Sequence, residues 1–116
     1  MRIYAVADIH GKPEKIALVR EKTEALKPDA LVVAGDITNY FNPVDVIEQF
    51  NHMPAPVLAI RGNTDLSRVD RLLDDYPNTT SLHLREHKIK GVGFVGISGT
   101  IMVDFDPDGS FRVKML

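Results

Sequence analysis

Three short apolar runs, at residues 3–7, 30–34 and 57–60, most constrain how this chain can fold. Each run is followed by a segment in which apolar residues recur at helical spacing. Alternation of strand-like and helix-like segments is typical of βαβ units with a parallel sheet. We therefore predict an α/β fold with a βαβαβα first half. The uninterrupted apolar run at 30–34 indicates a central strand that is covered on both faces.

Proline and capping residues predict where two of the helices begin. Pro13 suits the first turn of a helix, and Asn42-Pro43 followed by Asp45 is typical of a second helix start. The residues expected to face the sheet are Ile16, Val19, Thr23 and Leu26 in the first helix, Val46, Ile47, Phe50 and Met53 in the second, and Leu66, Val69, Leu72, Leu73 and Tyr76 in the third.

The pattern changes after residue 77. Short runs at 80–84, 88–90 and 92–97 are separated by glycines and charges and show no helical period, which favours antiparallel or mixed strands. The tail, from residue 101 to 116, contains Asp108-Gly109 between two strand-like runs and predicts a C-terminal hairpin.

Composition limits the classes of protein to consider. With 116 residues, 44% of them hydrophobic, we expect one compact domain over residues 1–116. The net charge of −2 argues against nucleic-acid binding as a function, and no apolar run approaches the roughly 20 residues of a bilayer span. Without cysteine, a metal site would have to use histidine and oxygen ligands. These features, and the lack of a signal sequence, fit a cytoplasmic protein.

Each of the first three apolar runs ends in a polar motif, and the three motifs are Asp8-Ile9-His10, Gly35-Asp36 and Gly62-Asn63. Because parallel strands end at the same edge of a sheet, we expect the three loops to converge. Asp8 and His10, two residues apart in an extended segment, would project to the same side and bind one ion. Carboxylate, imidazole and amide oxygen ligands suit Mn, Fe, Zn or Mg. Asn63 could also be merely a left-handed turn residue.

At these motifs the chain resembles the calcineurin-like metallophosphoesterase superfamily, whose ordered motifs are D-x-H, G-D, G-N-H-D/E, a lone H and G-H-x-H. The resemblance covers roughly the first 99 residues, through the segment that follows the third motif in small stand-alone prokaryotic members. It implies an α/β/β/α sandwich and divalent ions (Mn, Fe, Zn, Ni or Mg). It also implies hydrolysis of a phosphomono- or diester by a metal-bound hydroxide. Asp8 and His10 would bind the first ion, Asp36 would bridge, and Asn63 would bind the second, which makes Asp36 and Asn63 the candidate catalytic residues.

The chain departs from the family pattern in two places. Thr64 stands where the family usually has a histidine that helps the leaving group, and nothing matches the lone H or G-H-x-H. Ser98-Gly99-Thr100 runs almost directly into the terminal hairpin, as though an interior block of the sandwich were missing. The resemblance therefore implies an incomplete domain with impaired hydrolysis; the alternative is a catalytically silent scaffold that binds metal or a partner. A shortened sandwich leaves apolar surface uncovered, so we expect a homodimer that buries Ile97, Ile101, Val103 and Phe105.

Other polar residues have simpler interpretations. We expect Asp65 to be the N-cap of the third helix. His52, near a helix C-terminus, and His83 and His87, beside charged residues, are expected on solvated surfaces and not at the metal site.

Overall fold

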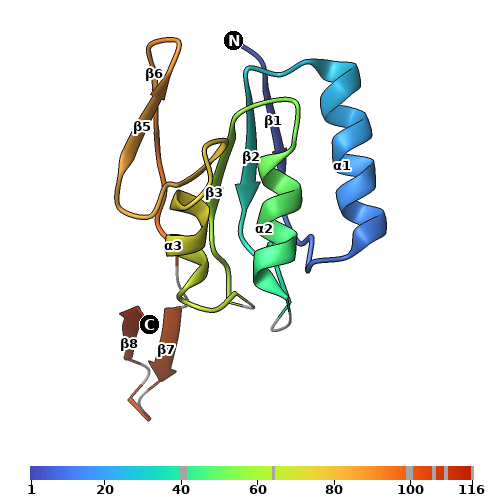
Figure 1. The fold of residues 1–116 in the computed structure, drawn as a ribbon. Helices are drawn as coiled ribbons and strands as arrows, with labels where there is room; N and C mark the ends of the chain where they lie inside the picture. The colour runs from blue at the N-terminus through green and yellow to red at the C-terminus, as the bar shows by residue number, and fades with distance from the viewer. Residues whose placement is uncertain (40–41, 64, 99–100, 106, 109, 116) are drawn as a thin grey trace.

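Four parallel strands form the central sheet of the computed structural model, in the order β1-β2-β3-β4 (Figure 1). The structure describes residues 1–39, 42–63, 65–98, 101–105, 107–108 and 110–115. The strands are β1 (Ile3–Val6), β2 (Ala30–Ala34), β3 (Val57–Ile60) and β4 (Thr79–Ser81), and each pairs in parallel with the next. The first three strands therefore lie at the predicted positions, and β4 extends the parallel sheet by one strand.

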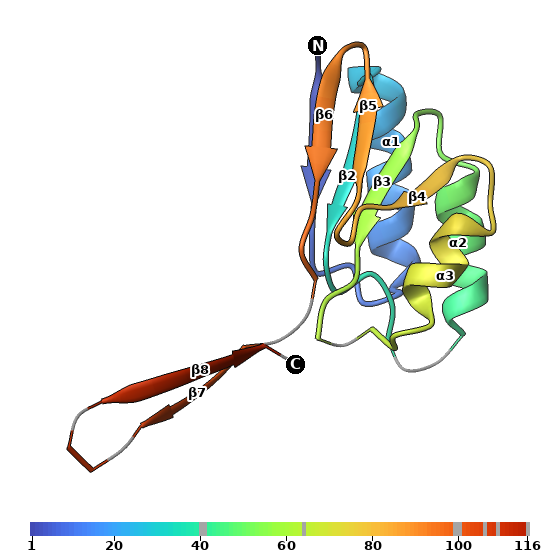
Figure 2. The ribbon, with the colours of Figure 1, turned by 90° about the vertical axis from the view of Figure 1, so that its left-hand side faces the viewer.

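Three helices cover one face of this sheet (Figure 2): α1 (Pro13–Leu26), α2 (Pro43–Asn51) and α3 (Val69–Asp74). The strands follow each other across the sheet in chain order, and right-handed crossovers then place every connecting helix on the same face. Pro13 and Pro43 lie in the first turns of their helices, as predicted. Asn42 precedes α2 in a left-handed conformation, but its side chain makes no capping hydrogen bond. The third helix begins later than predicted, since Leu66 lies before it and is 38% exposed.

The main core lies between the helices and the sheet. Leu31 and Val33 of β2 and Val57 and Ala59 of β3 point toward the helices, where Phe50 is 1% exposed. Alternate residues on the same strands point to the opposite face, as the two-residue period of a strand requires. The predicted burial of both faces of β2 is therefore confirmed for most of the strand, although Ala34 at its end is exposed.

A two-stranded antiparallel hairpin covers part of the second face of the sheet. It consists of β5 (Glu86–Ile89) and β6 (Val92–Val95), and Ile89 and Phe94 pack against a small core of Ala30, Leu58 and Leu82. Figure 2 shows this hairpin on the side of the sheet opposite the helices. The layers are thus helices, parallel sheet and β-hairpin, which confirms the mixed α/β class and the predicted mixture of strand directions.

The C-terminal segment forms the predicted hairpin, from β7 (Ile101–Phe105) and β8 (Phe111–Met115). It extends away from the rest of the molecule (Figure 2). The predicted turn at Asp108-Gly109 is only partly visible, because Gly109 lies outside the described residues. Asp108 accepts hydrogen bonds from the backbone N–H and the hydroxyl of Ser110, at 2.9 and 2.6 Å.

Asp29 ties the β5–β6 hairpin to the start of the chain. Its carboxylate accepts a hydrogen bond from Lys90 Nζ and another, at 2.8 Å, from the backbone N–H of Arg2. Lys90 and Gly91 form the tight hairpin turn, and both have positive φ, as this turn type requires. The hydrogen bond from Lys90, followed by that from Arg2, holds the pKa of Asp29 below its ordinary value.

The Asp29 contact predicts a pH dependence. Because folding favours the ionised carboxylate, its stabilising effect is complete above the ordinary aspartate pKa of about 4 and is lost as the pH falls through the lowered pKa. Lys90→Met should raise the pKa of Asp29 toward its ordinary value, as measured by NMR titration of its carboxyl carbon. Lys88→Met removes the same charge from an exposed position on β5 and should leave that pKa unchanged. Equal shifts in both variants would contradict a role for the contact.

Candidate metal centre

Asp8, His10 and Asp36 meet at the carboxyl edge of the parallel sheet. Asp8 and His10 lie in the loop after β1 and Asp36 lies in the loop after β2, and one ligand atom from each lies within 4.8 Å of the others. Asp8 Oδ1 is 3.8 Å from His10 Nε2, and the Asp8 side chain is 72% exposed. Two carboxylates and one imidazole that converge at this spacing form a donor set that fits a divalent transition metal or Mg²⁺.

All three of these residues have a left-handed backbone. The φ angles are +57° for Asp8, +53° for His10 and +51° for Asp36. The expectation of an extended segment between Asp8 and His10 was therefore wrong, although the two side chains do converge. Left-handed non-glycine residues cost of order 1 kcal/mol each, and such strain often lies at functional sites. Here hydrogen bonds from His10 N to Asp36 O and from Gly11 N to Ile37 O, both 2.9 Å, hold the two loops together.

Gly62 brings the loop after β3 into contact with Asp36. A Cβ atom at position 62 would lie 2.3 Å from Asp36 Oδ1 and 2.4 Å from Asp36 N, so only glycine fits there without movement. Gly35 also packs tightly against this loop, since its own Cβ would be 3.3 Å from the Cα of Gly62. Asn63 directly follows Gly62, so the loop that carries it lies against Asp36 at the same edge of the sheet. Asn63 itself is exposed.

Asp65 connects the loops after β2 and β3 and was not predicted to do so. Its carboxylate is buried and accepts hydrogen bonds from Ile37 N, Thr38 N and Gly62 N at 3.0, 2.7 and 2.8 Å. The hydroxyl of Thr38 donates a further hydrogen bond, at 2.7 Å. The expected role as N-cap of the third helix is wrong, because α3 begins at Val69 and Arg68 is its N-cap. Gly62 directly precedes Asn63, and Ile37 directly follows Asp36. By binding Gly62 and Ile37, Asp65 fixes the relative positions of the loops that carry these two predicted ligands.

Two cations lie near this edge. Lys15 Nζ donates to the carbonyl oxygen of Asp8 at 2.9 Å, and Arg61 Nε donates to Asp70 Oδ2 at 2.8 Å. The Arg61 side chain is 23% exposed and its ion pair attaches the loop before Asn63 to α3. The charge of Arg61 is balanced by Asp70, whereas Lys15 contacts a neutral carbonyl and adds positive charge that would favour the approach of an anion.

The remaining three histidines are not part of the cluster formed by Asp8, His10 and Asp36. His52 follows α2, is exposed, and has Nδ1 3.2 Å from Glu48 O, as expected for a helix C-terminus. His83 and His87 were expected on solvated surfaces, and both are half-buried. His87 lies opposite Phe94 in the β5–β6 hairpin, and the ring of His83 is hydrogen-bonded to Ser98. Thr64, the predicted departure from the family pattern, lies outside the described residues.

The fold and these motifs place the chain in a known class of proteins. The profile of the calcineurin-like phosphoesterase family matches residues 1–109, and the chain belongs to this family. Among individual relatives, it is 31% identical over 113 residues to the Methanocaldococcus jannaschii protein MJ1162, a match that covers 96% of this chain and 49% of that protein. It is 32% identical over 88 residues to the phosphodiesterase YfcE of Escherichia coli, covering 68% of this chain and 47% of YfcE.

Solved structures show the same relationship. TT1561 of Thermus thermophilus superposes with a TM-score of 0.77 at 16% identity, over 93% of this chain and 53% of that one. The E. coli phosphoesterase Yfce superposes with a TM-score of 0.57 at 26% identity, over 78% of this chain and 53% of that one. The chain thus spans about half the length of the relatives that it matches. Within the described ranges, every helix is too short or too polar to cross a bilayer.

Proposed function

We propose that this chain binds one or two divalent ions through Asp8, His10, Asp36 and Asn63 and hydrolyses a small phosphomono- or diester at that site. The observation that carries the proposal is the convergence of two carboxylates and an imidazole within 4.8 Å at the carboxyl edge of the sheet. Membership of the phosphoesterase family and the similarity to a phosphodiesterase support the same chemistry.

The four residues would have distinct roles. Asp8 and His10 would hold one ion, Asn63 would hold the second, and Asp36 would contribute to both. Bound ions would supply a water-derived nucleophile and screen the charge of the phosphate, whichever of Mn, Fe, Zn, Ni or Mg is present. The high exposure of Asp8 leaves the site open to a substrate, and Lys15 adds positive charge nearby. Turnover is weak in this proposal, because Thr64 cannot protonate a leaving group as a histidine does.

A second candidate function is a metal-binding scaffold without catalysis. It is favoured by the small number of imidazoles, since the chain has four histidines and the other three lie away from the cluster of Asp8, His10 and Asp36. Across the described residues this cluster is the one group of three such side chains close enough to share an ion. An incomplete ligand set would bind metal weakly and would position a nucleophile poorly.

Assays with Asp36→Ala separate the two candidates. We expect the wild type to hydrolyse p-nitrophenyl phosphate or bis-p-nitrophenyl phosphate slowly with Mn²⁺, Ni²⁺ or Zn²⁺. Asp36→Ala should lower that rate by a factor of roughly 100 or more. Asp75→Ala is the matched control, because it removes an exposed aspartate at the end of α3. Metal binding by calorimetry without hydrolysis in any metal would favour the scaffold, and activity that survives in Asp36→Ala would contradict the assignment.

We also propose that the chain is a cytoplasmic homodimer. Three exposed apolar residues are Ile3 on β1 (47% exposed), Val95 at the end of β6 (68%) and Ile97 just after it (61%), and β1 is an edge strand of the sheet. Exposed apolar side chains beside an unpaired strand edge favour association. Light scattering at micromolar concentration should give a dimer mass for the wild type and a monomer mass for Val95→Asp with Ile97→Asp. A monomeric wild type would disprove the proposal.

A further inference from the structure

His83 lies at the edge of the sheet that carries the candidate metal centre. β4 is parallel to β3, with Ala59 opposite Ser81, so the residues after Ser81 reach the same edge as the loop that contains Asn63. The backbone N–H of Leu82 continues this pairing by donating to Ala59 O at 2.9 Å. β3 separates β4 from β2, so the ends of β4 and β2 are roughly 10 Å apart. His83 is not one of the three clustered ligands, and its segment lies on the Asn63 side of the centre.

The ring of His83 is oriented by Ser98. The backbone N–H of Ser98 donates to His83 Nδ1 at 3.0 Å, and Ser98 Oγ lies 2.8 Å from the same nitrogen. Because Nδ1 accepts this hydrogen bond, the neutral ring carries its proton on Nε2. Ser98 itself is 5% exposed, and its segment is held by the parallel bridge between His83 and Gly96. The result is a half-buried imidazole with a defined tautomer and an N–H donor at its outer nitrogen.

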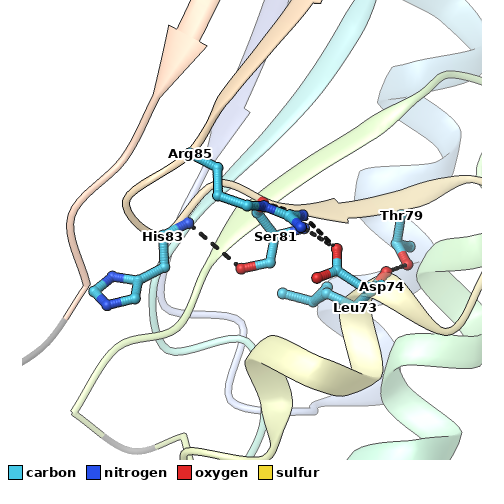
Figure 3. Close-up of polar contacts among 6 residues, drawn as sticks. All are labelled: Leu73, Asp74, Thr79, Ser81, His83 and Arg85. Carbon is cyan, nitrogen blue, oxygen red and sulfur yellow. Dashed lines mark hydrogen bonds and ion pairs between the residues drawn. The ribbon is translucent and has the colours of Figure 1, made fainter.

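The backbone on either side of His83 is also held in place. Arg85 donates from Nη2 to Asp74 Oδ1 at 2.6 Å and from Nε to Ser81 O at 3.1 Å, while Ser81 N donates to Asp74 Oδ1 at 3.1 Å. Figure 3 shows that the His83 ring points away from this network of Asp74, Ser81 and Arg85. The network therefore fixes the chain around His83 without using its outer nitrogen.

We propose that His83 is a substrate-binding residue, which donates a hydrogen bond from Nε2 to an oxygen of the phosphate ester on the Asn63 side of the centre. This inference rests on the proposed function. A hydrogen-bond donor fixed in one tautomer suits a phosphate oxygen, which only accepts. Ser98 is the positioning residue, because it selects the nitrogen that carries the proton.

The test measures binding of phenylphosphonate, a phosphate-ester analogue that is not hydrolysed, to the Zn²⁺-loaded protein. In the wild type, the ¹⁵N signals of His83 should show the Nε2–H tautomer and should shift when phenylphosphonate is added. His83→Asn keeps a polar atom near the Nδ1 position but lacks the outer donor, and it should weaken binding roughly 10-fold. His83→Gln places a donor near the Nε2 position and should restore most of that loss. His87→Asn removes the other half-buried histidine of this region and should leave phenylphosphonate binding unchanged.

The outcomes distinguish this inference from the proposed function. If the wild type binds no Zn²⁺, or binds Zn²⁺ but no phenylphosphonate, both fail. If it binds both while the His83 signals do not move and His83→Asn binds normally, only the inference is overturned. A drop in Zn²⁺ affinity in His83→Asn would also overturn it, because His83 would then be a metal ligand. Loss of stability in His83→Asn with unchanged phenylphosphonate affinity would overturn it too, since the role of His83 would then be purely structural.

Discussion

Asp65→Ala should lower the free energy of unfolding by about 3–5 kcal/mol, one of the two largest effects expected in this protein. The buried carboxylate accepts three backbone N–H hydrogen bonds and one from the Thr38 hydroxyl, and the substitution removes all four of these hydrogen bonds. Such a loss is a large fraction of the stability of a domain of this size. Chemical denaturation with two-state analysis measures it directly.

Asp65→Asn and Asp75→Ala complete this experiment. The asparagine has the shape of aspartate but turns an NH₂ group toward backbone donors, so it should recover little of the lost stability. Asp75 is exposed at the end of α3, and its replacement by alanine should change stability by less than about 0.5 kcal/mol. A stable Asp65→Ala variant would mean that the carboxylate does not hold the two loops together.

Gly62→Ala should weaken Zn²⁺ binding roughly 10- to 100-fold, by displacing a ligand and not by removing one. The added Cβ would lie 2.4 Å from the backbone nitrogen of Asp36, and a backbone atom cannot move aside as a flexible side chain can. Asp36 must then shift relative to Asp8 and His10. Calorimetry gives the affinity, and the amide shifts of Asp36 and His10 report the displacement.

Gly91→Ala is the control for a glycine substitution. Gly91 has φ +79° in the β5–β6 turn, and a Cβ there would meet nothing within 4 Å. The variant should lose about 1 kcal/mol of stability through backbone strain and should keep the Zn²⁺ affinity of the wild type. Equal Zn²⁺ affinities for the wild type and Gly62→Ala would show that the loop after β3 does not support the metal centre.

Local patterns in the sequence were sufficient for most of the fold. The apolar runs placed β2 and β3 at their observed residues, and Pro13 and Pro43 marked the starts of α1 and α2. Hydrophobic period and proline geometry act over a few residues, so they can be read without the tertiary structure. The start of α3 was less predictable, because Leu66 fits the helical period but lies in the loop before the helix.

The convergence of Asp8, His10 and Asp36 also followed from the sequence, because parallel strands end at the same edge of their sheet. The backbone conformation that brings these side chains together did not follow from the sequence. A two-residue spacing suggested an extended segment, whereas both Asp8 and His10 are left-handed and are held by hydrogen bonds to the loop after β2. Those hydrogen bonds join residues far apart in the chain, and no local pattern encodes them.

The positions of Asp65 and His83 in the fold could not be predicted from local sequence either. In the sequence, Asp65 resembles a helix cap and His83 resembles a surface residue among charges. Their roles depend on partners that lie 27 residues away at Thr38 and 15 residues away at Ser98, and only the folded chain brings these together. By itself, the sequence determined the order of the elements and the edge where the polar motifs meet, since both depend on short-range periodicity and strand direction. The tertiary structure decided which buried groups hold that edge in place, because hydrogen bonds between distant loops exist only after the sheet has formed.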